Sequence, residues 1–260
     1  MPRAVLMLLL VVGGAWLTAC GKGGYAGSRE SSSSPRSTGA GRSQPPSHGS
    51  LSRPRALAFA QAVNLTAEDV PGFQAGEKTH GSSAREQRLE REMTRCAGGG
   101  GAKVTGAEHR ALVDQSSKDF QLKHGILNFG VSSQVSVQPS ATEARRGLQA
   151  IRSARVRNCF SHYLQLLFNG ERLKGATPGP VTIQGGIPPA PGTTGGFGWR
   201  VTASFLVRGV KIPIYLDYLG FVDGPAEVTL LSSGLIRPFP AEVQQHLFAL
   251  LLARAKRHAL

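Results

Sequence analysis

WRVTASFLVRGVKIPIYLDYLGFVDGPAEVTL, residues 199–230, carries the clearest β pattern of this 260-residue chain. From Trp199 to Val207 the odd positions are apolar and most even positions are polar, which is the period of a strand with one buried face. After Gly209 the alternation resumes on even positions, from Val210 to Leu216. Asp223-Gly224 is a strong tight-turn signal, and residues 226–230 alternate again. We therefore expect three antiparallel strands joined by short hairpins.

The rest of the domain adds one strand and several helices. Phe129, Val131, Val135 and Val137 alternate with mostly polar residues until Pro139, which predicts a strand. Capping-box patterns at Ser83/Glu86 and Ser140/Glu143, together with apolar stripes, predict helices. The helical regions that we expect are 54–63, 84–96, 141–151 and a last helix that starts at Pro240. A broad apolar stripe over 160–168 either continues the helix after Ser140 or starts another one. This order predicts a single α+β domain, a mostly antiparallel sheet covered by helices.

The N-terminus predicts an exported protein. Arg3 precedes an apolar run, Ala4 to Trp16, that is too short for the ~20 residues of a membrane-spanning helix but fits a signal peptide. The next four residues, LTAC (17–20), resemble the bacterial lipobox. That resemblance implies cleavage after residue 19 and lipidation of Cys20, so that residues 1–19 are a lipoprotein signal peptide. Several acyl chains give stable anchoring where one would be marginal. An ordinary signal with an incidental cysteine is the alternative.

A linker separates this anchor from the domain. Residues 20–52 are rich in Gly, Ser and Pro and have scarcely any large apolar side chains. Such a segment buries too little surface to offset the entropy of ordering, so we interpret it as a flexible tether. The folded, extracytoplasmic domain is then expected over residues 53–260.

The two other cysteines are expected to form a disulfide. Without Cys20, an exported chain retains an even pair, Cys96 and Cys159, for which pairing is the default expectation. Both lie on the apolar faces of expected helices. Neither has a second ligand at metal spacing, and we interpret His162, three residues after Cys159, as structural.

Several segments resemble a known family. They are NLTAEDVPGF, Cys96, the strand that ends VSVQPS, the helix ATEARRGLQAIRS with Cys159, and YLDYLGFVDGPAEVTLL. Together they resemble the PknH-like extracellular sensor domains of actinobacterial kinases and lipoproteins over residues 56–257. The resemblance implies a disulfide-stabilised α+β module presented outside the membrane, with a ligand cleft. It carries over no ligand-binding residue, and this chain lacks a kinase domain.

No catalytic motif is present in the sequence. It contains no HExxH, no G-x-S-x-G elbow and no phosphate-loop lysine motif. The Gly/Pro-rich segment 185–198 looks superficially like a nucleotide loop, but its prolines indicate a hairpin loop. We interpret Asp217 as a solvated or hydrogen-bonded acid, with a binding-site acid as the alternative. We expect no catalytic residue, no metal and no cofactor.

Charge suggests which partners the domain could bind. The formal net charge is +14, of which Arg3 and the tether account for four, so about +10 belongs to the domain. Five arginines crowd one helical region: Arg145, Arg146, Arg152, Arg155 and Arg157. Outside a cell the nearer anions are lipid head groups and wall polymers rather than nucleic acid, which we do not expect as a partner. A solvated helix face is the alternative interpretation.

Three functions remain open from the sequence. The first is a non-enzymatic sensor or ligand-binding lipoprotein of the cell envelope, anchored to the membrane at Cys20. The second is a carrier of a lipid or another hydrophobic ligand, because Phe160, Tyr163 and Phe168 form an aromatic stripe. The third, an envelope hydrolase, has no residue that nominates a nucleophile or a base.

Overall fold

The computed structural model describes residues 51–76, 84–97, 111–170, 176–258 and 260. The predicted signal peptide, Cys20, most of the tether and Ser83 of one capping box lie outside these residues. In chain order the elements are α2 (Arg53–Val63), η1 (Ala67–Asp69), β1 (Gln74–Ala75), α3 (Ala84–Cys96), β2 (Val113–Ser116), β3 (Phe120–His124), β4 (Leu127–Val137), α4 (Ala141–Arg152), α5 (Ala154–Gly170), β5 (Ala176–Pro178), β6 (Thr182–Gly186), β7 (Gly195–Val207), β8 (Val210–Asp223), β9 (Ala226–Leu235) and α6 (Ala241–Arg257).

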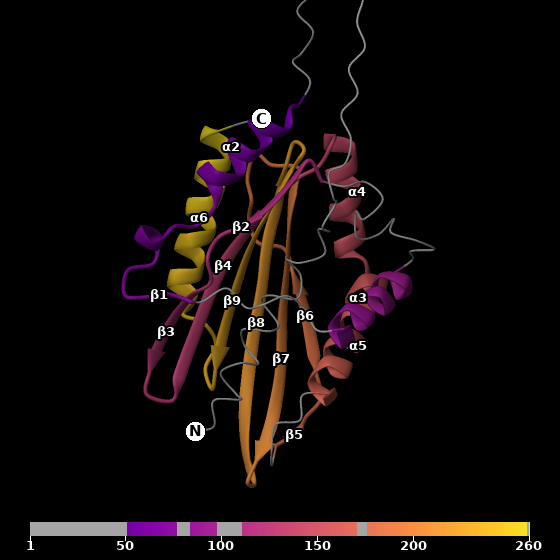
Figure 1. The fold of residues 1–260 in the computed structure, drawn as a ribbon, viewed down its shortest axis with the longest axis vertical. Helices are drawn as coiled ribbons and strands as arrows, with labels where there is room; N and C mark the ends of the chain where they lie inside the picture. The colour runs from indigo at the N-terminus through magenta and orange to yellow at the C-terminus, as the bar shows by residue number, and fades with distance from the viewer. Residues whose placement is uncertain (1–50, 77–83, 98–110, 171–175, 259) are drawn as a thin grey trace, which may run out of the picture.

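All described strands belong to one sheet, and every pairing in it is antiparallel. The order is β1-β3-β4-β9-β8-β7-β5, with β2 also pairing with β4 and β6 with β7. The predicted meander is confirmed as β7-β8-β9, in which Trp199 lies opposite Tyr218 and Tyr218 opposite Leu231. The predicted α+β class, a mostly antiparallel sheet with helices on it, is confirmed as well (Figure 1).

Tight turns set the register of this meander. Arg208 and Gly209 join β7 to β8 with φ angles of 51° and 80°. Positive φ at both central residues matches the twist of a two-residue hairpin, and glycine adopts it without a Cβ clash. The predicted turn at Asp223-Gly224 joins β8 to β9, and Gly224 has a φ of 56°.

Helices cover both faces of the sheet, in two separate groups. Successive side chains of a strand point to opposite faces of the sheet, so the residues of one strand contact the helices on both faces. On β8, Leu216 and Tyr218 pack in the cluster under α3 and α5, whereas Leu219 and Phe221 pack in the cluster under α2 and α6. Figure 1 shows α2 and α6 on one side of the sheet and α3, α4 and α5 on the other.

Helix boundaries follow the predicted capping signals closely. Ser140 caps α4 by accepting a hydrogen bond from the backbone N–H of Glu143 at 3.2 Å. Ser153 separates α4 from α5, where the sequence left open whether one helix continues, and its hydroxyl accepts from the Val156 N–H at 3.2 Å. Pro240 is the N-cap of α6 rather than its first helical residue. None of the described helices is long and apolar enough to cross a membrane.

Asp217 lies on the α6 side of the sheet, 3% exposed. It accepts hydrogen bonds from Arg200 Nε at 2.6 Å and Nη2 at 2.9 Å, and from Gln244 Nε2 at 3.1 Å. The interpretation of Asp217 as a hydrogen-bonded acid is confirmed, and this acid joins β7, β8 and α6.

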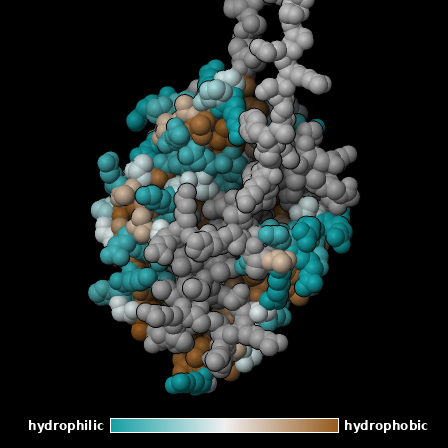
Figure 2. Space-filling model, viewed as in Figure 1, coloured by the Kyte–Doolittle hydropathy of each residue, from teal (hydrophilic) through white to brown (hydrophobic). Residues whose placement is uncertain are grey.

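The surface is largely polar outside these layers. Figure 2 shows hydrophilic residues over much of the visible described surface, with hydrophobic surface at the foot of the molecule. Figure 1 places the β7–β8 turn at that foot, and Leu206 and Val210 beside the turn are 48% and 63% exposed. Small exposed apolar groups of this kind are ordinary for a folded domain.

Candidate functional site

One face of the sheet changes from polar to apolar along its width. A row of opposed residues crosses it from β4 to β7: Ser132, Leu231, Tyr218 and Trp199. The neighbouring row runs through Gln134, Thr229, Gly220 and Phe197. The polar residues of the two rows lie on β4 and, at Thr229, on β9, whereas the aromatic ones lie on β7 and β8. The helices α4 and α5 pack mainly over the apolar half.

A cleft follows this boundary between the two halves. Its larger part holds about 650 Å³ of space, some of it open to solvent. Its lining combines polar strand residues with apolar side chains: Ser116, Ser132, Ser133, Gln134, Glu227 and Thr229 with Ile151, Phe160, Phe197, Trp199, Tyr218 and Leu231. A smaller hollow shares Ser132 and Leu231 with it and extends toward β3. An apolar wall facing a few polar groups is the usual form of a small-molecule site.

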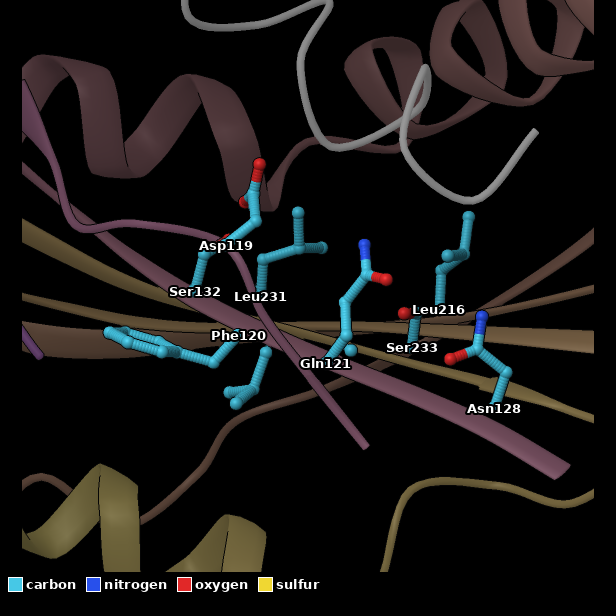
Figure 3. Close-up of a pocket in the computed structure, with 10 residues that line it drawn as sticks. Asp119, Phe120, Gln121, Asn128, Ser132, Leu216, Leu231 and Ser233 are labelled. Atoms are coloured by element: carbon cyan, nitrogen blue, oxygen red, sulfur yellow. The ribbon is translucent and has the colours of Figure 1, made fainter. Parts of the chain in front are cut away.

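Figure 3 shows the end of the cleft at β3 and β4. Asp119, Gln121 and Asn128 project from the same side of the strands, toward the viewer's top, where α4 and α5 lie. Phe120 projects to the opposite side, toward α6, and is 1% exposed. The strand alternation thus separates a polar lining from the core behind it.

Aromatic rings form the apolar end of the cleft. The Phe160 ring of α5 lies 5.3 Å from Trp199 and 5.6 Å from Tyr218, the latter edge to face. A Cβ atom at Gly220 would overlap the Phe197 ring, so this glycine allows that ring to lie across β8. The rings give the cleft a rigid wall made from three elements.

Two polar side chains at the β3 end of the cleft, those of Asn128 and Asp119, are withdrawn from water. Asn128 is 6% exposed, and its Oδ1 atom has no hydrogen-bond partner among the described residues. A buried acceptor of this kind costs free energy until a donor reaches it. Burial raises the pKa of Asp119 above its ordinary value, although a hydrogen bond with the Ser132 side chain opposes the shift.

Glu227 lines the other end of the cleft. Burial, with a smaller contribution from the Asp114 carboxylate on β2, raises the pKa of Glu227 to about 7. Beside it in the sheet lie Ser136 and Val222. A Cβ atom at Gly147 of α4 would lie 3.8 Å from Glu227 Oε2. Gly147 is therefore the α4 residue that faces this carboxylate, and it has no side chain there.

We expect Glu227→Gln to stabilise the protein at alkaline pH. The pKa of this acid is raised on folding from its ordinary 4.5, so its ionisation opposes folding as pH rises through about 7. Allowing for its partial exposure, the variant should be about 2 kcal/mol more stable than wild type at pH 8.5 and nearly equal to it at pH 4. Urea unfolding at both pH values measures this difference. Glu242→Gln, on the exposed side of α6, is the matched control, and an equal gain from it would refute the assignment.

The five arginines predicted as an anion-facing patch lie along α4 and the start of α5. Two of them donate hydrogen bonds to backbone carbonyls: Arg152 Nε to Gly196 O at 2.9 Å, and Arg155 Nε to Cys96 O at 2.9 Å. Arg145 and Arg146 are exposed, and Arg157 is partly buried near Gly185. None of the five lines the cleft. Their role as an anion-facing patch stays a prediction.

The predicted disulfide is confirmed. Cys96 at the end of α3 is bonded to Cys159 of α5, with Cα atoms 5.7 Å apart.

Of the predicted aromatic stripe, Phe160 lines the cleft, whereas Phe168 packs against Phe205 in the core. His162 is exposed, and the described residues contain no group of three or more His, Cys, Asp or Glu side chains that could hold a metal ion.

Apart from Phe160, the cleft residues were missed by sequence reasoning. Trp199, Tyr218 and Thr229 were recognised as strand residues, and the even positions of 128–136 as the polar side of a strand. The available signal was that Asn128, Ser132 and Gln134 share one face, but the sequence does not show which strands lie next to that face.

Comparisons with known proteins give one structural neighbour. No family model matches the chain, and no curated protein matches it. The crystal structure of the extracellular domain of PknH from Mycobacterium tuberculosis is similar at 11% sequence identity, with a TM-score of 0.45, over 81% of this chain and 100% of that one. It is an extracellular domain of the family that the sequence motifs resemble. At this identity and TM-score, no residue, ligand or activity is transferred from it.

Proposed function

We propose that this protein is a lipid-anchored, extracytoplasmic binding module whose ligand site is the cleft between β4, β9, β8 and α5. The observation that carries the proposal is the lining of this cleft, in which the aromatic wall of Trp199 and Tyr218 faces the polar residues of β4. The role is that of a non-enzymatic sensor or ligand-binding lipoprotein. The disulfide supports an oxidising location outside the cytoplasm.

A carrier of a hydrophobic ligand is the second candidate. It is favoured by the apolar share of the cleft, where Ile151, Phe160 and Phe197 surround the space. A carrier and a sensor differ in what happens to the bound ligand. A carrier exchanges its ligand with a membrane, whereas a sensor holds a ligand whose concentration it reports.

Trp199 is a direct probe of the cleft. The chain has two tryptophans, and Trp16 lies in the predicted signal peptide, so Trp199 is the one tryptophan of the mature chain, and Trp16→Phe keeps it so in a chain that retains the signal peptide. Adding an extract of bacterial envelopes to this full-length variant is expected to shift the Trp199 emission. Thr229→Phe, which fills the boundary of the cleft, should abolish the shift, whereas Thr202→Phe on β7, outside the cleft lining, should retain it. A shift that survives Thr229→Phe would contradict the proposal.

We expect Cys20→Ser to release the protein from the membrane. The wild-type chain, expressed in a bacterial host, should begin at residue 20, carry the added mass of acyl chains and sediment with membranes. The Cys20→Ser chain should lack that mass, and Ser31→Ala in the tether should behave as wild type. An intact-mass spectrum of an unmodified wild-type Cys20 would rule out the anchor.

A further inference from the structure

The larger part of the cleft has one acidic lining residue, Glu227 of β9. None of the other described residues that line it is charged, although the domain as a whole has a formal charge of about +10. Among the described residues, none donates a hydrogen bond to the Glu227 carboxylate, and no positive side chain lowers its pKa. A carboxylate that is partly withdrawn from water and lacks a described counter-charge favours the approach of a cation.

A second carboxylate lies near Glu227 on the same face of the sheet. Asp114 of β2 is opposite Ser136 of β4, and Ser136 is opposite Glu227, so the two acids flank one serine. Gln134 Nε2 donates a hydrogen bond to Asp114 Oδ1 at 2.6 Å. The Asp114 carboxylate therefore has a donor of its own and adds negative potential at Glu227, which is the acid that faces the cleft.

An apolar surface follows Glu227 along the same strand. Glu227, Thr229 and Leu231 alternate along β9, so their side chains lie on one face, and each is partly exposed in the lining of the cleft. From Glu227 to Leu231 the strand rises about 13 Å, at ~3.3 Å per residue. Leu231 is opposite Tyr218, which is opposite Trp199. A ligand with a charged group at Glu227 would thus lay an apolar body over Leu231 beside these rings, and burial of that body favours binding.

We propose that the cleft binds an organic cation, with its charged group at Glu227 and its apolar body along β9 over Thr229 and Leu231. This inference rests on the proposed function and names the class of ligand. Helix α4 leaves room for the charged group, because Gly147, the residue that faces the carboxylate, has no side chain. An anionic ligand would meet two carboxylates at this end of the cleft, and a neutral ligand would leave their charge uncompensated.

Three octyl compounds test the inference, because they share one chain and differ in charge: octyltrimethylammonium, octanol and octanoate. Each is titrated at pH 8, above the pKa of about 7 for Glu227, into the full-length Trp16→Phe chain held in a non-ionic amphipol. Trp199 emission gives the affinity. The cation should bind about tenfold more tightly than the other two compounds. Glu227→Gln should reduce this preference to about twofold or less, and Glu242→Gln should leave it unchanged.

Leu231→Ala tests the position of the apolar body. It should weaken the binding of all three compounds by a similar factor, about fivefold, because the octyl chain loses its contact with the leucine side chain. The preference for the cation should remain. Leu206→Ala on β7, which is exposed and outside the cleft lining, is the matched control. Affinities that are unchanged in Leu231→Ala would overturn the path along β9.

The outcomes separate this inference from the proposed function. Equal affinities, a preference for octanoate, or a cation preference that survives Glu227→Gln would overturn the assignment of an organic cation. If no octyl compound binds but the envelope extract still shifts Trp199 emission, the cation assignment fails and the binding function stands. If neither shifts the emission, the binding function itself is overturned.

Discussion

Replacing both Cys96 and Cys159 by alanine is expected to lower the free energy of unfolding by about 4 kcal/mol. The bond closes a loop over a sequence separation of 63 residues, and in the chain-entropy model a cross-link of that length restricts the unfolded chain by this amount. The structure adds a local reason. Among the described residues, α3 contacts α5 and buries only Leu89 and Met93 of its own side chains there. Two arginine hydrogen bonds, from Arg85 Nη2 to Leu166 O and from Arg155 Nε to Cys96 O, join the same two helices.

Urea unfolding of the oxidised wild type and the double variant measures the change. The arginines of α3 provide a second readout, because Arg85, Arg88, Arg91 and Arg95 are trypsin sites. Without the disulfide, α3 should be cleaved by trypsin well before the sheet unfolds. A loss of less than 1 kcal/mol together with unchanged trypsin resistance would show that packing alone holds α3 in place.

Phe160→Ala is expected to lower the free energy of unfolding by about 4 kcal/mol, the usual cost of removing a buried phenylalanine ring. Phe160 is fully buried and contacts the Tyr163, Trp199 and Tyr218 rings, with centroids 5.3–6.1 Å apart. Its removal would leave a void beneath the aromatic wall of the cleft. The Trp199 emission should therefore change along with stability.

Chemical denaturation checks this value, with Leu57→Ala as the control. Leu57 lies on α2 and is 41% exposed, so its truncation should cost less than about 0.5 kcal/mol. If Phe160→Ala does not fold, Phe160→Leu serves for the same measurement, with a smaller expected loss in the free energy of unfolding. A Phe160→Ala chain as stable as Leu57→Ala would contradict the packing described.

Elements with strong periodic patterns were predictable from the sequence. The meander of β7, β8 and β9 follows from alternation and from turns at Arg208-Gly209 and Asp223-Gly224, where local backbone preference and sheet twist agree. The helix capped by Ser140 was found for the same reason, because the cap is a local interaction.

The short strands were missed, and the expectation of four strands was too low. β5 and β6 span three and five residues, and β6 ends in Gly185-Gly186, so neither shows an apolar period. They are strands because β7 provides hydrogen-bond partners, which is tertiary information. β3 alternates over FQLKH only, which is too short to distinguish from chance.

The candidate site could not be predicted, because it depends on strand order. Asn128 and Trp199 are 71 positions apart in the sequence, and two other strands lie between theirs in the sheet. Alternation assigns each residue to a face of its own strand but does not align one strand with another. The cysteine pair was predictable because counting cysteines in a chain that is expected to be exported requires no strand order.

Native mass spectrometry of the full-length chain, purified from bacterial envelopes, tests most directly whether the cleft holds a ligand. We predict a discrete non-covalent adduct on the native protein that is absent from its denatured mass. Thr229→Phe should lose the adduct, and Thr202→Phe should keep it. A native mass equal to the denatured mass, or an adduct that is unchanged in Thr229→Phe, would contradict the assignment of this cleft as the binding site.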